Sequence, residues 1–570
     1  EESEEVAEEI QVVEEEPQEE TTEPTEEEPA VEEFPEEEEP ILEEAPEEEF
    51  SLQSDEGTLV SGTCGENVSW VLTSDGTLTI SGSGKMADYN TSSNTAPWYK
   101  NRTSVVSVVV KSGVTSLSSY AFYGCYKLAS AILEVGVETV GSYAFQDCKK
   151  LTGVMLSDGL KEIGYDAFSG CTGLTDVTIP EGVTKLGSSA FYNCSSLTSV
   201  NIPAAVTSIG GSTFYNCSSL TGVTIPVGVT SIGYSAFSGC RNLTSVTIPD
   251  SVTSIDSLAF SDCSALTSVN IPDRVTSIEN SVFSGCGSLT SVNIPAGVTS
   301  IGSSAFSGCG GLTSVAIPDG VTSIGSSAFS GCSGLTSVTV PEGVTSIRYS
   351  AFSGCSSLTS VTIPESITNI EESTFYKCSS LTSVTIPDSV TSIGEWAFYA
   401  CTGLTSVNIP NSVTRIDMCA FYECSSLKSV TIPSSVTQIG AAVFASSGVS
   451  VTVVPDNKRY CSENGMLFDK EKTELCYGGP SGTAFRMPES VETIGWLSFY
   501  GRNDLTSITI PGNVKEIGNT AFKNCENLRS VVLSDGVTKI GGSVFYYCTV
   551  LTSITIPKSL TSIGADAFLG

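Results

Sequence analysis

A 23-residue period constrains the fold of this chain more than any other feature of its sequence. A phenylalanine stands at Phe122 and at every twenty-third residue up to Phe444, which makes 15 copies across residues 105–449. After a break the spacing resumes at Phe499 and continues to Phe568, which adds four copies. Self-similarity at a period of about 20–50 residues predicts a solenoid, in which each copy forms one coil.

The copy that begins at Leu335 shows how one coil can be built. Val338 and Val340 are two residues apart, so both side chains point to one face of a β-strand, and Thr339 between them points outward. Pro341 cannot donate a hydrogen bond to a sheet and therefore ends the strand. One coil cannot bury its apolar face alone, so we expect stability to come from stacking against the neighbouring coils.

The second half of this copy returns the chain across the core. Val344 and Ile347 are the apolar residues of the return, and Ala351 and Phe352 fill the far side, which we expect to be one short helical or 3₁₀ turn. Leucine-rich repeats have periods of about 20–29 residues. The predicted fold class is therefore a leucine-rich-repeat solenoid, mainly β with short helical or 3₁₀ turns, and about 19 coils of 23 residues.

Two turn positions of the repeat differ in the residues that they tolerate. The residue after the second Ile is Gly302 in one copy and Asp256 in another, so the backbone there has no strict need for a positive φ. The residue before the repeat cysteine is most often Gly, Asn or Asp, as at Gly308, Asn193 and Asp262. That preference is typical of a turn in the left-handed conformation.

The full copy, L-T-S-V-T-I-P-x-x-V-T-S-I-G-x-x-A-F-x-x-C, resembles the BspA-type leucine-rich repeat. This family occurs in surface proteins of host-associated bacteria and of some protists. The resemblance covers residues 105–449 and 482–570 and implies a leucine-rich-repeat solenoid, secretion or surface display, and often adhesion to host proteins or to other microbes. It transfers no binding residue, because the residues that define the repeat are core residues.

Residues 1–50 differ from the repeats in composition. They contain 26 Glu and neither Lys nor Arg. Because like charges repel and little apolar surface is present to offset chain entropy, we expect a disordered Glu/Pro-rich spacer, either a solvated tail or a segment that binds cations or a partner. The chain does not begin with Met, which fits a secreted chain without its signal peptide or a piece of a longer protein.

Residues 51–104 precede the array and predict an N-terminal β-cap. Trp70 and Leu72, and then Leu78 and Ile80, stand at alternating positions on either side of a Ser-Asp-Gly turn, which is typical of a hairpin. The open end of a solenoid needs a cover, because an exposed strand edge can pair with other chains. We expect Trp70 and Trp98 to lie in the core of the cap; a ligand platform is the alternative.

Residues 450–481 interrupt the array and predict a β-hairpin island, with strands at 465–468 and 473–477. One interpretation is an insertion tolerated at the corner of a coil. The other is a recognition knob that projects from the solenoid. The last four coils then occupy residues 482–570, and the final coil is cut short. The island carries a basic cluster formed by Lys458, Arg459, Lys470 and Lys472.

Sixteen of the 20 cysteines occupy one position of the repeat, beginning at Cys125. Neighbouring copies lie about 5 Å apart, but parallel Cβ directions suit a disulfide poorly, so we expect a ladder of buried thiols that fills space. A metal site is disfavoured, because one ligand per coil cannot form a tetrahedron and no C-x-x-C occurs. Outside the ladder, Cys461 and Cys476 flank the predicted hairpin, and a disulfide between them is an open alternative.

Residue content and charge exclude several classes of function. The chain has no histidine, so no catalytic triad, proton shuttle or metal site can use one. A net charge of −39 argues against nucleic acid, which needs a basic face. No apolar run approaches the length of a transmembrane helix, about 18 residues. No G-x-S-x-G, P-loop, H-E-x-x-H or EF-hand pattern occurs, so we expect neither catalysis nor a cofactor or metal.

The candidate binding surface is the row of outward residues at the centre of the first strand of each coil. Such a row makes a flat polar stripe at regular spacing along the stack. A plain solvated sheet is the alternative interpretation. Together with Ala316, the row consists of Thr178, Asn201, Thr224, Thr247, Asn270, Asn293, Thr339, Thr362, Thr385, Asn408 and Thr431.

These observations predict a secreted or cell-surface repeat protein that acts as a binding scaffold or adhesin for host or microbial surface proteins or glycans. The alternative is a passive stalk or surface-coat component that displays a C-terminal domain beyond Gly570. The incomplete last coil favours such a domain, because an array should end in a cap or an anchor. A third hypothesis places a catalytic domain outside this chain.

Overall fold

The structure is a computed structural model that describes residues 57–480 and 487–569. These residues belong to one compact unit, Ser54–Gly570. The predicted spacer at residues 1–50 and the first residues of the predicted second array, 482–486, lie outside the described residues.

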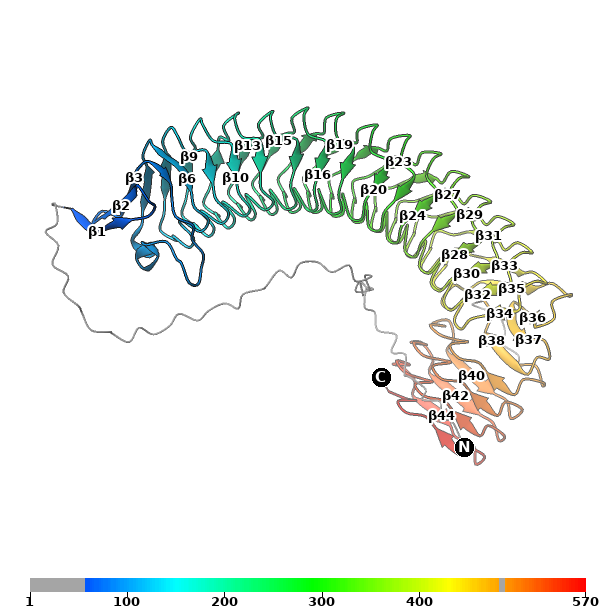
Figure 1. Cartoon of the computed structure of the whole chain (residues 1–570). Helices are drawn as coiled ribbons and strands as arrows, with labels where there is room; N and C mark the ends of the chain where they lie inside the picture. Colours follow the sequence, from blue (N-terminus) through cyan, green and yellow to red (C-terminus); the bar gives the residue numbers. More distant parts are fainter. Residues whose placement is uncertain (1–56, 481–486, 570) are drawn as a thin grey trace, which may run out of the picture. The chain divides into compact units, whose positions relative to one another are not determined.

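The repeats form a solenoid of stacked coils, which confirms the predicted fold class. Each coil contributes one strand to a first row and a second strand to a second row, and most strands in both rows pair in parallel with those of adjacent coils (Figure 1). In the first row, β25 (Ser337–Thr339) pairs with β27 (Ser360–Thr362). In the second row, β24 (Ser323–Ile324) pairs with β26 (Ser346–Ile347). Equivalent residues of successive coils are therefore direct neighbours.

The first row runs through both parts of the array. Its strands are short, because in most coils a proline follows the second inward residue. The strands are β5 (Ser107–Val110), β7 (Ser130–Leu133), β9 (Gly153–Met155), β11 (Asp176–Val177), β13 (Ser199–Asn201), β15 (Gly222–Thr224), β17 (Ser245–Thr247), β19 (Ser268–Asn270), β21 (Ser291–Asn293), β23 (Ser314–Ala316), β25, β27, β29 (Ser383–Thr385), β31 (Ser406–Asn408), β33 (Ser429–Ile432), β35 (Ser450–Val453), β40 (Ser507–Ile510), β42 (Ser530–Leu533) and β44 (Ser553–Thr555).

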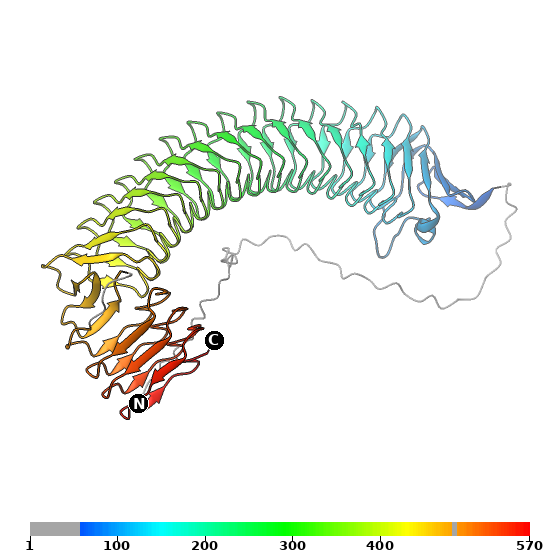
Figure 2. The same cartoon turned by 180° about the vertical axis from the view of Figure 1, so that it is seen from behind.

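The second row is the return path of each coil, and Figure 2 shows the stack from behind. Most of its strands hold only two residues, an outward polar one and an inward apolar one. They are β4 (Gly84–Lys85), β6 (Val114–Leu117), β8 (Thr139–Val140), β10 (Glu162–Ile163), β12 (Lys185–Leu186), β14 (Ser208–Ile209), β16 (Ser231–Ile232), β18 (Ser254–Ile255), β20 (Ser277–Ile278), β22 (Ser300–Ile301), β24, β26, β28 (Asn369–Ile370), β30 (Ser392–Ile393), β32 (Arg415–Ile416), β34 (Gln438–Ile439), β39 (Thr493–Ile494), β41 (Glu516–Ile517), β43 (Lys539–Ile540) and β45 (Ser562–Ile563).

The strands that precede the array extend its first row. Antiparallel strands β1 (Thr58–Thr63), β2 (Val68–Thr73) and β3 (Thr77–Gly82) form a meander, and β3 pairs in parallel with β5. The 3₁₀ helix η1 (Tyr99–Ser104) leads into the first coil. The rings of Trp70 and Trp98 meet edge to face with centroids 5.5 Å apart, and both residues are buried, as expected for the core of a cap.

A column of phenylalanine rings forms the centre of the core. Trp98 stacks on Phe122, and each repeat phenylalanine then stacks on the next as far as Phe444, with ring centroids 4.9 to 5.9 Å apart. Each such ring buries about 150–250 Å². Because both faces of a ring are covered only when two further coils are present, the column couples every coil to its neighbours.

The far side of the coil is a run of hydrogen-bonded turns rather than a helical segment. The N–H groups of Ala351, Ser353 and Cys355 each donate to the carbonyl oxygen three residues earlier. The N–H groups of the residues between them point to the next coil; that of Phe352 donates to the Thr374 oxygen at 3.0 Å. Ser350 makes this alternation possible by adopting a left-handed φ of 56°. A continuous helix would keep all of these donors within one coil.

The two turn positions behave as their residue preferences indicate. The residue before the repeat cysteine has a positive φ, as at Gly308 (71°) and Asn193 (57°). Gly302 does not, and its role is close approach: a Cβ there would lie 2.7 Å from the backbone carbon of Glu279 in the preceding coil.

The interruption of the array is a three-stranded meander that is built into the stack. Antiparallel strands β36 (Tyr460–Glu463), β37 (Met466–Asp469) and β38 (Glu474–Tyr477) follow one another, and β38 pairs in parallel with β39. Leu467 packs in the core of the preceding coils, and Phe468 packs in the core of the following coils. The meander therefore joins two hydrophobic cores.

Candidate binding surfaces

The outward residues of the first row form one exposed column, which we call the polar column. It contains the predicted residues from Thr178 to Thr431, and every one of them is exposed. Thr339 pairs in register with Thr362, and Thr362 with Thr385, so the side chains repeat once per coil. The side chains are short and stand on a continuous sheet, which gives the column a flat and rigid base.

In two other rows, the threonine hydroxyl groups donate hydrogen bonds to backbone carbonyl groups of the preceding coil. The hydroxyl of Thr336 donates to the Thr313 oxygen at 3.1 Å, and that of Thr345 donates to the Thr322 oxygen at 3.3 Å. Both patterns recur along the stack. Thr339 and the other threonines of the polar column form no side-chain hydrogen bond with any described residue. The column therefore carries hydrogen-bonding groups that folding leaves available.

Asn201 is an exception within the polar column. Its amide nitrogen donates to the Ile179 oxygen, and its amide oxygen accepts from the Ile179 N–H, both at 2.8 Å. The adjacent strand β11 stops at Val177, so the backbone of Ile179 has no neighbouring strand to pair with there. The side chain of Asn201 supplies both missing backbone hydrogen bonds, so this residue has a structural role and its amide is not free.

The polar column continues into an aliphatic segment that the sequence analysis missed. Val109 pairs in register with Ile132, and Ile132 with Met155, one coil at a time before Thr178. Met155 is 64% exposed. Counting back from Thr178 in steps of 23 residues reaches these positions, but they do not fit a uniform Thr/Asn row.

The four basic residues of the island do not share one environment. The Nζ of Lys470 donates to the oxygens of Pro455 and Asn457, at 3.2 and 2.6 Å. Lys472 forms an ion pair with Glu463. Lys458 and Arg459 are exposed and pair with no carboxylate in the described parts of the chain. Only the latter two thus remain available to a ligand.

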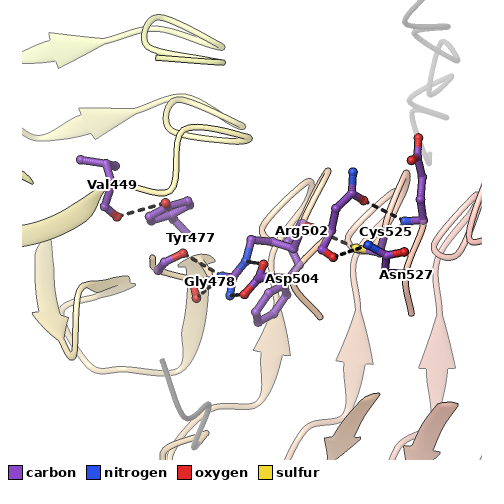
Figure 3. Close-up of polar contacts among 11 residues, drawn as sticks. Val449, Tyr477, Gly478, Arg502, Asp504, Cys525 and Asn527 are labelled. Carbon is purple, nitrogen blue, oxygen red and sulfur yellow. Dashed lines mark hydrogen bonds and ion pairs between the residues drawn. The ribbon is translucent and has the colours of Figure 1, made fainter. Parts of the chain in front are cut away.

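A buried arginine fastens the meander to the last coils (Figure 3). Arg502 occupies the repeat position that holds cysteine in most coils and is only 6% exposed. Its Nη1 donates to the oxygens of Gly478 and Gly479, at 3.0 and 2.7 Å. Its Nε and Nη2 bind the two carboxylate oxygens of Asp504, at 2.6 and 2.9 Å. This bidentate pair fixes the guanidinium plane and directs Nη1 at the meander.

The opposite side of the meander is held by Tyr477. Its hydroxyl donates to the Val449 oxygen at 3.1 Å (Figure 3). Its ring meets that of Phe444 edge to face, with centroids 5.9 Å apart. Gly478 is required beside it, because a Cβ there would lie 2.3 Å from the ring of Phe499. We call the contacts of Tyr477, Gly478 and Arg502 between the meander and the adjacent coils the junction. Because these residues are closely packed, we assign the junction a structural role.

The repeat cysteines form the predicted ladder of buried thiols. Cys309 donates its S–H to the Phe283 oxygen at 3.2 Å, and this bond recurs in nearly every coil. Burial raises the pKa of Cys309 from its ordinary value of 9.0 to about 12. Every cysteine in the described residues is a free thiol.

Cys461 and Cys476 do not form the disulfide considered above. They lie on β36 and β38, which flank β37 on opposite sides. Two strand spacings separate the chains by roughly 9–10 Å, beyond the reach of a disulfide. The Sγ of Cys461 instead donates to the Asp469 oxygen at 3.1 Å.

The cap carries a pocket of about 420 Å³, lined in part by Cys64, Glu66, Lys85 and Tyr89. The Tyr89 hydroxyl donates to the Cys64 oxygen at 3.1 Å, and burial raises the pKa of the Cys64 thiol to about 12. Across residues 57–480 and 487–569, no group of three or more His, Cys, Asp or Glu residues is arranged to hold a metal ion. No helix in the same residues has the length and apolar character to span a membrane.

Comparison with known proteins places these features in context. The family described as BspA type Leucine rich repeat region (6 copies) matches residues 96–221, 207–336, 322–450 and 472–570. No curated protein matches the chain. Among solved structures, a leucine-rich repeat protein from Bacteroides ovatus is 30% identical, with a TM-score of 0.49, over 66% of this chain and 90% of that one.

Two further solved structures match the chain at lower identity. A leucine-rich repeat protein from Eubacterium ventriosum is 24% identical, with a TM-score of 0.37, over 70% of this chain and 97% of that one. A leucine rich cell surface protein from Faecalibacterium prausnitzii is 24% identical, with a TM-score of 0.30, over 88% of this chain and 95% of that one. The family match spans most of the chain, and the repeat that defines it builds every coil described above. The chain belongs to the BspA-type leucine-rich-repeat family.

Proposed function

We propose that this chain is a cell-surface or secreted binding scaffold whose ligand lies along the polar column. The observation that supports this function is the difference between threonine rows. The rows that contain Thr336 and Thr345 use their hydroxyl groups to bind the neighbouring coil, whereas Thr339 and its equivalents do not. Free hydroxyl and amide groups recur in most coils of the column on a rigid sheet, with Asn201 and Ala316 as the exceptions.

The repetition suits an extended ligand, a protein segment or a glycan, with hydrogen-bonding groups at regular intervals. Threonine is β-branched and restricted at χ1, so little side-chain entropy is lost on binding. Each contact is weak, but contacts along one ligand act together, because the first one raises the effective concentration for the next. Affinity should therefore rise steeply with the number of coils engaged.

The test is a saturable-binding screen of the full chain against mucins, matrix proteins and glycans. A triple variant, Thr339→Val, Thr362→Val and Thr385→Val, removes three adjacent hydroxyl groups from the polar column. A matched control carries Thr299→Val, Thr322→Val and Thr345→Val in the second row. We expect about a tenfold loss of affinity for the first variant, from three lost hydrogen bonds, and a change within about twofold for the control.

Two results would refute this function. One is the absence of saturable binding across the panel by a chain whose folding is confirmed by circular dichroism, and that result would favour a passive stalk. The other is unchanged affinity in the triple variant, which would place the ligand elsewhere on the molecule.

A further inference from the structure

The first two coils carry a group of cations and a tyrosine that no function described above uses. Tyr126 and Lys127 follow the repeat cysteine of the first coil, and Lys149 and Lys150 follow that of the second. The two cysteines are one coil apart, so Tyr126 lies next to Lys149, whose Nζ is 5.8 Å from the centre of the tyrosine ring. We call this surface, together with Lys100 and Arg102 of η1, the basic edge.

Helix η1 brings Arg102 against the first coil. Its guanidinium lies 4.2 Å from the ring centre of Tyr99, and its Nη1 donates to the Tyr99 oxygen at 3.2 Å. Gly124 lies between Arg102 and Tyr126: a Cβ there would be 3.6 Å from the Nε of Arg102 and 3.5 Å from the hydroxyl of Tyr126. The helix and the two coils thus present one contiguous surface.

No ion pair within the described residues neutralises the charges of the basic edge. None of the five cations forms an ion pair with another described residue, and the four lysines are exposed. The carboxylate of Asp147, which is partly buried, interacts electrostatically with Lys149. Burial raises the pKa of Asp147, and Lys149 partly offsets that effect. A positive surface that forms no ion pair with a described residue, on a chain of net charge −39, indicates an anionic ligand.

The extent of the basic edge restricts the kind of anion. In the third coil the positions of Lys149 and Lys150 are taken by Thr172 and Gly173, so the positive surface ends after two coils. Double-stranded nucleic acid carries one charge per about 1.7 Å and needs a longer basic face. A ligand with carboxylates separated by neutral rings needs only a few cations. Tyr126 is 43% exposed and offers a surface for the C–H face of a sugar ring.

We propose that the basic edge binds an acidic polysaccharide, with Lys127, Lys149 and Lys150 pairing with uronate carboxylates and Tyr126 packing against a sugar ring. This site is separate from the polar column and does not rest on the function proposed for it. Binding through charge should weaken with rising salt, because the lysines are exposed to screening. The chemistry predicts selection for the charge on the sugar rather than for the sugar chain itself.

The experiment measures binding of the full chain to an oligogalacturonate and to its methyl ester, which keeps the sugar chain and lacks the charge. The test variant is Lys149→Glu with Lys150→Glu. The control is Arg241→Glu with Arg274→Glu, which changes net charge equally at two exposed cations of other coils. Circular dichroism confirms that each variant is folded.

We expect the parent to bind the acidic oligomer and not its methyl ester. The test variant should lose about tenfold or more in affinity, while the control stays within about twofold. A Tyr126→Ser variant should weaken binding to a smaller extent, because it removes the ring and keeps the charge. The proposal is overturned by absent binding, by equal affinity for the methyl ester, by an equal loss in the control, or by tighter binding of a single-stranded RNA. The polar-column variants leave this site intact, so failure of one proposal does not entail failure of the other.

Discussion

One repeat position is filled in two different ways in two regions of the molecule. In the regular stack it holds a thiol such as Cys309, which donates one hydrogen bond to the Phe283 oxygen. At the meander it holds Arg502, which donates to the oxygens of Gly478 and Gly479. Both residues satisfy backbone carbonyls of the preceding chain from inside the core.

The choice between cysteine and arginine depends on which backbone carbonyl groups the preceding segment presents to this position. A preceding coil presents one carbonyl at a fixed short distance, so a small side chain is sufficient. The meander presents two carbonyls from a backbone that does not follow the coil, and only a long side chain with several donors reaches both. A coil can therefore follow a segment that is not a repeat, because one substitution, Arg502, supplies the hydrogen bonds that this segment needs.

The largest effect is expected from alkaline pH, which should break the regular stack before the junction. Burial raises the pKa of Cys309 and Cys240 to about 12, above the 9.0 of an unfolded thiol. The unfolded chain therefore loses protons first, so thiol burial stabilises fully below about pH 9 and this stability is lost as pH rises toward 12. At the junction the same repeat position holds Arg502 in place of a thiol.

Circular dichroism and thiolate absorbance, followed from pH 8 to 12, test this expectation. The coils should unfold together with thiolate formation. Retention of the native spectrum after the thiols have ionised would contradict the role given to burial.

The next largest effect concerns the phenylalanine column. Phe329→Ala removes a ring that is stacked on both faces, and we expect a loss of about 3–5 kcal/mol from the cavity and the missing contacts. Phe568, in the last coil, is 41% exposed and stacks on Phe545 alone among its repeat partners. Phe568→Ala should cost about 1 kcal/mol. Urea unfolding of both variants compares them, and equal losses would show that stacking from two sides adds nothing.

At the junction, Arg502→Met keeps the length of the side chain and removes its donors. We expect a loss of about 3 kcal/mol, because two buried carbonyl groups lose their partner. The coils from β39 onward should then melt in a separate transition by calorimetry. Arg502→Cys restores the repeat residue and should not restore stability, because one thiol cannot reach both carbonyls. A cysteine variant as stable as the parent would remove the distinction between the two regions.

The smallest effect compares two exposed threonines within the stack. Thr336→Val loses the hydrogen bond to the Thr313 oxygen and should destabilise the array by about 0.5–1 kcal/mol. Thr339→Val loses no intramolecular bond and should change stability by less than about 0.3 kcal/mol. Paired thermal melts measure the difference. Equal effects would indicate that the polar column contributes to the stability of the fold to the same extent as the neighbouring rows.

Much of the fold is predictable because the 23-residue period can be read directly from the sequence. The spacing of Phe122 and its equivalents, the inward Val338 and Val340 and the terminating Pro341 together define the coil and the buried thiol ladder. The left-handed Ser350 was not predictable, because serine is the most common residue at this position and Asp, which is more typical of positive φ, stands there only at Asp166 and Asp566. Bonds to the next coil impose that conformation, and those bonds depend on the stack.

The candidate site was predictable in position and not in composition. The outward residues follow from strand alternation, but the structural role of Asn201 depends on where the neighbouring strand ends. The ion pair of Lys472 and the carbonyl contacts of Lys470 depend on the path of the meander. The sequence shows Arg502 as a substitution at the cysteine position of the repeat. Its partners Gly478 and Gly479 could not be predicted, because they lie in the meander, which does not follow the repeat.

The alternating turn after each phenylalanine has a mechanical consequence. Half of its N–H groups, such as that of Phe352, point along the stack to the next coil. A pull applied at the ends of the solenoid therefore acts along these bonds, and we expect the coils to detach one after another. Each coil that peels away releases 23 residues, or roughly 75–80 Å of extended chain. Under shear the array would lengthen in equal steps while the remaining coils keep their surface.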